Sequence, residues 1–128
     1  GIGKFKLRKN NFIGNVYALV NDGTYSAGVI FSSVLRKYNR AVFVGEETGG
    51  NPIIMAGYLI KTSWELPNTK IQFGSGTLCT IYDDLGLNRG RGLVPDHTIK
   101  MKPEDILSLH DRCLDFTLQH IRSGRRPL

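Results

Sequence analysis

The sequence predicts an α/β fold built around one strand-helix-strand unit. Residues 16–20 (VYALV) are an apolar, β-branched run that is typical of a buried strand. A short polar turn follows, and residues 26–38 then repeat apolar side chains at helical spacing. Residues 41–44 (AVFV) are a second apolar run, and this order favours two parallel strands joined by a right-handed crossover. With 41% hydrophobic content, residues 1–128 are expected to form a single domain.

The junction between the first strand and the helix has the layout of a nucleophile elbow. Residues 21–24 form the sharp turn, and Ser26 stands where the helix begins. The backbone N–H of Ala27 could then stabilise an oxyanion formed by attack of Ser26, while Gly23 and Gly28 leave room for a substrate. One face of the helix is expected to be apolar and to pack on the core; it comprises Ala27, Ile30, Phe31, Val34 and Leu35.

A plainer interpretation of the same junction is a helix cap. Serine and threonine are common N-caps, so Thr24 or Ser26 could serve only that purpose. The pattern is also not the G-x-S-x-G of hydrolases, because Gly23 stands three residues before the serine. From spacing alone, the cap is the commoner role.

A glycine-rich segment, residues 45–52 (GEETGGNP), follows the second strand. Ligands of open α/β sheets bind at the carboxyl ends of the strands, so this segment and Ser26 are expected side by side. It lacks the lysine and the helix start of a phosphate-binding loop, so nucleotide binding is not expected. The alternative is a flexible connector.

The second half of the chain predicts further strands and a final helix. Residues 58–66 and 70–73 flank a turn and indicate a hairpin or two short strands, and residues 77–82 indicate one more strand. A loop over residues 83–92 follows. One continuous helix is expected from Pro103 to Gly124, with an apolar core face made by Ile106, Leu107, Leu114, Leu118 and Ile121.

Charge and composition point away from several classes of protein. The net charge is +6, concentrated at the two ends of the chain, and no RNA-binding or zinc-finger pattern accompanies it. A solvated surface is therefore favoured over nucleic-acid binding. The two cysteines have no close spacing, so no metal site is expected. No signal peptide is recognised, and no apolar run is long enough to span a membrane.

Four pieces occur in the order known from one family: LVNDGTYSAGVIFSSVLR, RAVFVGEETGG, LPNTKI and GRGLVPD. Over residues 12–96 the chain thereby resembles the S41 peptidases, which include the C-terminal processing (tail-specific) and tricorn-type proteases. The resemblance implies a ClpP/crotonase-like core and a serine endopeptidase in which Ser26 is the nucleophile and Ala27 supplies one oxyanion amide. It implies a protein or peptide substrate, no cofactor or metal, and a location in the bacterial cell envelope. The residues expected around the substrate are Gly23, Thr24, Gly28, Gly49 and Gly50.

The chain departs from the family where the general base is concerned. The lysine of the processing proteases is replaced by Asn51, so the base is expected to be a histidine upstream of this chain. On this interpretation the chain is the nucleophile-bearing, C-terminal half of the catalytic core and is inactive alone. Asp84 is the first candidate for the acid that orients the base, with Asp83 and Asn88 as alternatives. Within the chain, His97 is the candidate base.

Three other functions stay open at this stage. A catalytically inactive domain on the same fold would bind peptides or partners. A crotonase-like acyl-CoA enzyme would use backbone oxyanion holes without the serine. A basic nucleic-acid-binding domain would show strongly salt-dependent affinity.

Overall fold

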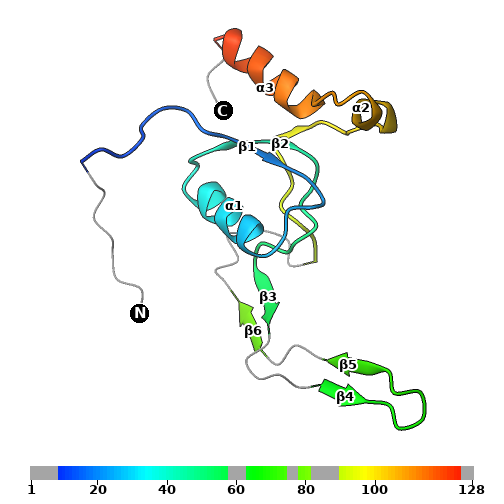
Figure 1. Ribbon diagram of the computed structural model, residues 1–128. Helices are drawn as coiled ribbons and strands as arrows, with labels where there is room; N and C mark the ends of the chain where they lie inside the picture. The colour runs from blue at the N-terminus through cyan, green and yellow to red at the C-terminus, as the bar shows by residue number, and fades with distance from the viewer. Residues whose placement is uncertain (1–8, 58–62, 75–77, 82–89, 125–128) are drawn as a thin grey trace.

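A three-stranded parallel sheet forms the centre of the molecule (Figure 1). The structure is a computed structural model that describes residues 9–57, 63–74, 78–81 and 90–124. The strands of this sheet are β1 (Tyr17–Val20), β2 (Val42–Gly45) and β7 (His97–Thr98), in the order β1-β2-β7. Helix α1 (Ala27–Lys37) connects β1 to β2. The predicted α/β class and the parallel strand-helix-strand unit are confirmed.

Strand β2 lies at the centre of the sheet and is buried along its whole length. Its continuous apolar run suits a strand covered on both faces. Figure 1 shows α1 and the C-terminal helix α3 (Arg112–Arg122) on opposite sides of β1 and β2. The core on the α1 side is made by Val20, Phe43 and Leu93, with Ala18, Leu35 and Ala41 packed against them.

Strand β7 was not predicted from the sequence, and a carboxylate explains its place in the sheet. The backbone N–H of Asp96 donates to the carbonyl of Phe43 over 2.9 Å, and the N–H of Phe43 donates to Asp96 Oδ2 over 2.7 Å. Arg36 of α1 pairs with the same carboxylate and lies over the Phe43 ring, 4.4 Å from its centroid. Asp96 therefore ties α1, β2 and β7 together.

The predicted core face of α1 is only partly right, since Leu35 packs against the core while Phe31 and Val34 do not. The buried residues are Val29, Ser32 and Ser33, whereas Phe31 is 64% exposed and Val34 is 48% exposed. Ser32 and Ser33 are each 5% exposed, and the Ser33 hydroxyl donates to the Ile30 carbonyl over 2.7 Å. A hydroxyl satisfied within its own helix can be buried at little cost, and hydrophobicity alone does not reveal this.

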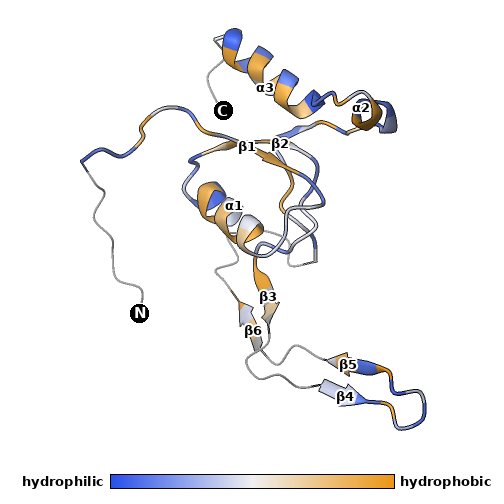
Figure 2. Cartoon of the chain, viewed as in Figure 1, coloured by the Kyte–Doolittle hydropathy of each residue, from blue (hydrophilic) through white to orange (hydrophobic). Residues whose placement is uncertain are grey.

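The predicted C-terminal helix is in fact two helices, α2 (Pro103–Leu107) and α3. Leu109 between them has φ 53°, a conformation that no helix contains. Asp111 then caps α3 by accepting the Leu114 N–H over 2.9 Å. The break turns α3 so that Thr117 is buried, while the residues expected in the core are exposed; they are Ile106, Leu107, Leu114, Leu118 and Ile121. Figure 2 shows hydrophobic and hydrophilic stretches alternating along α3.

The Asp105 carboxylate holds the junction between the two helices. It accepts the Lys102 N–H over 2.9 Å and both Arg112 Nε and Nη2 over 2.8 Å. These contacts, with the Arg112 hydrogen bond first, lower the pKa of Asp105 from 3.8 to about 2. Hydrogen bonds to the charged form favour that form.

A depressed carboxyl pKa makes this junction sensitive to acid. Its stabilising contribution is present above the ordinary carboxyl pKa and is lost as the pH falls from about 4 to about 2. We expect Asp105→Asn to lower the free energy of unfolding at pH 7, with the difference from wild type closing over that interval in urea titrations. The control is Asp22→Asn, at an exposed turn position. A gap that stays constant from pH 7 to pH 2 would contradict this assignment.

Two further two-stranded sheets extend away from the centre (Figure 1). Strand β3 (Ile54–Gly57) pairs antiparallel with β6 (Leu78–Ile81), and β4 (Ser63–Glu65) pairs antiparallel with β5 (Gln72–Gly74). The predicted hairpin is confirmed in its described residues, and Trp64 stacks on Phe73 with ring centroids 5.6 Å apart. No helix in the described part of the chain is long and apolar enough to cross a membrane.

Candidate active site

Ser26 occupies the junction of β1 and α1 in a strained conformation. Its backbone has φ 48° and ψ −120°, and its side chain makes no capping hydrogen bond to the helix. A positive φ is uncommon for a residue other than glycine and marks stored strain that often accompanies function. A sharp, strained turn between a strand and a helix is the backbone geometry of nucleophile elbows.

Neither candidate for a plain helix cap acts as one. The Thr24 hydroxyl accepts the Asn21 N–H over 3.1 Å, and the Ser26 side chain does not bond to the first turn. The Asn21 side chain in turn accepts the Gly23 N–H over 3.0 Å. These bonds build the turn that we call the elbow, residues 21–26. Ser26 is an exposed residue at the end of the elbow.

The N-terminus of α1 lies directly behind Ser26. Ala27 is the first helical residue, and the first N–H groups of a helix have no acceptor within it. The Gly28 N–H donates a hydrogen bond to the Tyr25 carbonyl over 2.9 Å. The Ala27 N–H, adjacent to Ser26, is among the first-turn amides that have no acceptor within the helix.

The glycine-rich loop, defined here as residues 46–51, packs against the elbow as expected from the parallel strands. The Gly50 N–H donates to the Thr24 carbonyl over 3.0 Å. A Cβ at Gly50 would come within 2.9 Å of Val29 Cγ1 and 3.0 Å of Tyr25 Cα, and one at Gly49 would overlap the Asp22 carbonyl and the Tyr25 hydroxyl. The two glycines thus allow a contact that no side chain would permit, which disfavours a flexible connector.

A groove of about 310 Å³ lies between the elbow, the loop and β3. Of the residues predicted around the substrate, Gly49 and Gly50 line it together with Ser26, whereas Gly23, Thr24 and Gly28 do not. Sequence reasoning missed five apolar or aromatic lining residues. Val29 and Ile30 stand three and four positions after Ser26 on the helix, a spacing that could have identified them. The full lining is Tyr25, Ser26, Val29, Ile30, Gly49, Gly50, Asn51, Ile54 and Ala56.

The Asn51 side chain, which the resemblance aligned with the lysine of the processing proteases, bonds to the residues that follow it and to Arg91. Its Oδ1 accepts the N–H groups of Ile53 over 2.8 Å and Ile54 over 2.9 Å, and its Nδ2 donates to the Arg91 carbonyl over 3.4 Å. This arrangement fixes the turn into β3. An amide also has no basic lone pair with which to take a proton from Ser26.

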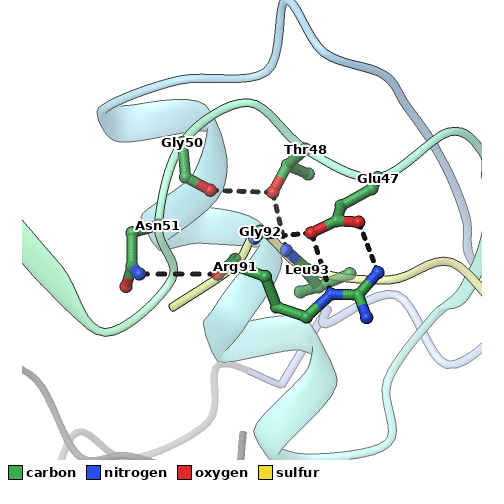
Figure 3. Close-up of polar contacts among 7 residues, drawn as sticks. All are labelled: Glu47, Thr48, Gly50, Asn51, Arg91, Gly92 and Leu93. Carbon is green, nitrogen blue, oxygen red and sulfur yellow. Dashed lines mark hydrogen bonds and ion pairs between the residues drawn. The ribbon is translucent and has the colours of Figure 1, made fainter. Parts of the chain in front are cut away.

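Residues 91–93 form hydrogen bonds and an ion pair with the glycine-rich loop (Figure 3). Glu47 binds Arg91 through both carboxylate oxygens, and the pair lowers the pKa of Glu47 and raises that of Arg91. The buried Thr48 hydroxyl donates to the Gly50 carbonyl over 2.9 Å and accepts the Leu93 N–H over 2.8 Å. Sequence reasoning did not find these contacts.

Among the residues that the structure describes, the candidate base His97 does not line the groove. Asp84, Asp83 and Asn88 lie outside the described residues. His97, the candidate base, is on β7, where its ring lies 5.1 Å from Phe116 and 5.2 Å from His120 of α3. No histidine, carboxylate or lysine is present among the described lining residues.

The chain is similar to one protein family and to solved structures of peptidases. The model of peptidase family S41 matches residues 3–80. A crystal structure from Parabacteroides merdae, assigned as a peptidase, is similar with 26% identity and a TM-score of 0.52, over 84% of this chain and 32% of the other. A structure from Bacteroides fragilis, assigned as an S41 protease, shares the fold with 16% identity and a TM-score of 0.54, over 88% and 28% of the respective chains. This chain thus spans about a third of their length, and it matches no curated protein. The chain belongs to peptidase family S41.

Proposed function

We propose that this chain carries the nucleophile of a serine endopeptidase and that the nucleophile is Ser26. The observation that supports the proposal most strongly is the backbone of Ser26, with φ 48° and ψ −120° and a hydroxyl that caps nothing. A structural serine at a helix start has no need of this strain, whereas a nucleophile must stand clear of the backbone.

Hydrolysis then proceeds by acyl transfer. Ser26 Oγ attacks the carbonyl carbon of the scissile bond, and its proton passes to a general base outside the described groove lining. The Ala27 N–H donates to the oxyanion that forms. The amine leaves with the proton, and water releases the acyl group from Ser26 by the reverse sequence of proton transfers. The base is a histidine in our proposal, supplied by another part of the protease.

The walls of the groove favour an apolar substrate side chain. Val29, Ile30, Ile54 and Ala56 line the groove together with Ser26, so four of its lining side chains are apolar. Apolar surface removed from water in such a groove contributes to binding in proportion to its area.

The size of the groove predicts a change of selectivity in one variant. Ala56→Phe fills space at the end of the groove contributed by β3, so substrates with a large apolar side chain are expected to lose about tenfold in kcat/KM relative to alanine substrates. The measurement is hydrolysis of matched peptide pairs by the full-length protein. Ile81→Phe, on the neighbouring strand and outside the groove lining, is expected to keep the wild-type ratio.

A fluorophosphonate probe tests the proposal, since it reacts with activated serines. We expect the full-length protein to be labelled and Ser26→Ala not to be. Ser63→Ala removes an exposed serine on β4 and should leave labelling unchanged. Labelling that persists in Ser26→Ala would reject Ser26 as the nucleophile.

One observation favours a second candidate, a peptide-binding domain without catalysis. Asn51 stands where the resemblance aligns the lysine of the processing proteases, and the described lining contains no histidine, lysine or carboxylate that could act as the base. Such a domain would bind apolar peptides in the groove with an affinity unaffected by Ser26→Ala, and no probe would label Ser26.

A further inference from the structure

The Glu47 carboxylate joins the glycine-rich loop to residues 91–92, which lie far from it in the sequence. Its carboxylate accepts Arg91 Nε over 3.1 Å, Arg91 Nη2 over 2.6 Å and the Gly92 N–H over 2.8 Å. All three donors come from one short segment 44 or 45 residues further along the chain. A guanidinium that binds a carboxylate with two parallel bonds fixes both distance and orientation.

The neighbouring residues continue the contact toward the groove. The Thr48 N–H donates to the Leu93 carbonyl over 3.1 Å, and Asn51 Nδ2 donates to the Arg91 carbonyl. The approach is so close that a Cβ at Gly92 would overlap the Thr48 carbonyl. Residues 47–51 and 91–93 are therefore joined at both ends and in the middle (Figure 3).

The other side of the loop touches the elbow through Gly50 and Gly49. The loop is thus held between residues 91–93 and the residues around Ser26. A shift of residues 91–93 would move Gly50 and Asn51, and both line the groove.

The ion pair itself contributes little to stability. The side chains of Arg91 and Glu47 are 53% and 36% exposed, and ion pairs this exposed are screened by solvent and contribute little to folding stability. Its bidentate geometry fits a role in holding the loop in place better than a role in holding the fold together.

We propose that Glu47 and Arg91 are positioning residues, whose ion pair holds the glycine-rich loop against the elbow and so maintains the groove around Ser26. Neither residue lines the groove. This inference rests on the proposed function for its effect on catalysis, while its effect on the loop can be measured without activity.

Three variants separate geometry from charge. Arg91→Lys keeps the charge and loses the two-point contact, Arg91→Gln loses both, and Glu47→Gln keeps an acceptor for Gly92 while losing the charge. Glu65→Gln is the matched control, since it removes another exposed ion pair, with Lys70 at 3.2 Å on the β4–β5 hairpin.

The first measurement is amide hydrogen exchange in the full-length protein. In all three variants we expect exchange to rise about tenfold or more over residues 48–54, with α3 and the control unchanged. Wild-type exchange over residues 48–54 in Arg91→Lys and Glu47→Gln would overturn the proposal.

The second measurement is the rate and the end point of fluorophosphonate labelling. Misplacement by a fraction of an ångström to an ångström is expected to slow labelling about ten- to a hundredfold, with Arg91→Lys close to Arg91→Gln. The final number of labelled sites should stay at the wild-type value, because the protein remains folded. Fewer labelled sites at an unchanged rate would mean partial unfolding and would overturn the positioning role.

The two measurements also distinguish this inference from the proposed function. Faster loop exchange in the variants, with no labelling of Ser26 even in wild type, would support the holding of the loop and reject the catalytic proposal. Faster loop exchange with an unchanged labelling rate would show that the groove does not depend on the ion pair, and would overturn the inference alone.

Discussion

Ser26→Ala is expected to lower kcat/KM for peptide hydrolysis by about 10⁴-fold or more. The substitution removes the atom that forms the acyl bond, and only the residual contribution of the oxyanion amide and of binding remains. The Ser26 side chain makes no capping hydrogen bond, so its removal does not weaken the N-terminus of α1. The assay is steady-state cleavage of an apolar peptide by the full-length protein.

The melting temperature provides the control for this variant. We expect Ser26→Ala to melt within a few degrees of wild type, since no buried contact is lost. If the variant kept a tenth or more of wild-type kcat/KM, Ser26 would not be the nucleophile and the elbow would have to be explained as a structural feature.

The largest expected effect on stability is at Gly45, the last residue of β2. Its φ of 128° is open only to glycine, and a Cβ there would overlap the Val20 carbonyl of the paired strand β1. Because both partners are backbone in the central sheet, neither can move aside. We expect Gly45→Ala to lower the free energy of unfolding by about 3 kcal/mol or more, measured by urea titration.

Gly28→Ala is the matched control for this prediction. Gly28 lies in the first turn of α1, where a Cβ would meet Thr24 Cγ2 at an ordinary 3.5 Å. Alanine is the better helix former, so a stabilisation of up to about 1 kcal/mol is expected. A Gly45→Ala variant as stable as Gly28→Ala would show that the β1–β2 contact is looser than described.

The centre of the fold was predictable because it depends on local pattern. Two apolar runs flanking one helix leave few arrangements, and the parallel pairing of Tyr17–Val20 with Val42–Gly45 followed from their order. The hairpin around residues 66–71 was predictable for the same reason, since its turn residues carry the signal.

The errors arose where a polar group finds a partner far away or within its own helix. The burial of Ser32 and Ser33 reverses the hydrophobic pattern of α1, and the Asp105–Arg112 contact accompanies the break before α3. Strand β7 depends on the bonds between Asp96 and Phe43, 53 residues apart. The spacing of apolar residues along the sequence does not reveal such contacts.

In the candidate site, too, the residues set by local motifs were predicted and those set by distant contacts were missed. Ser26, Ala27, Gly49 and Gly50 were predicted from turn chemistry and from the family's motifs, and of these Ser26, Gly49 and Gly50 line the groove. Ile54 and Ala56 were missed because they reach the groove from β3, whose pairing with β6 is not visible in sequence. The Glu47–Arg91 pair was missed because its members are 44 residues apart.

The most direct test of the central claim is a crystal structure of the full-length protein with a peptidyl boronic acid, which mimics the tetrahedral intermediate. We predict a covalent bond from boron to Ser26 Oγ, one boronate oxygen about 2.7–3.1 Å from the Ala27 nitrogen, and the apolar side chain of the inhibitor in the groove lined by Val29 and Ile54. A boronate bound to another residue, or bound at Ser26 with its oxygen directed away from Ala27, would contradict the mechanism.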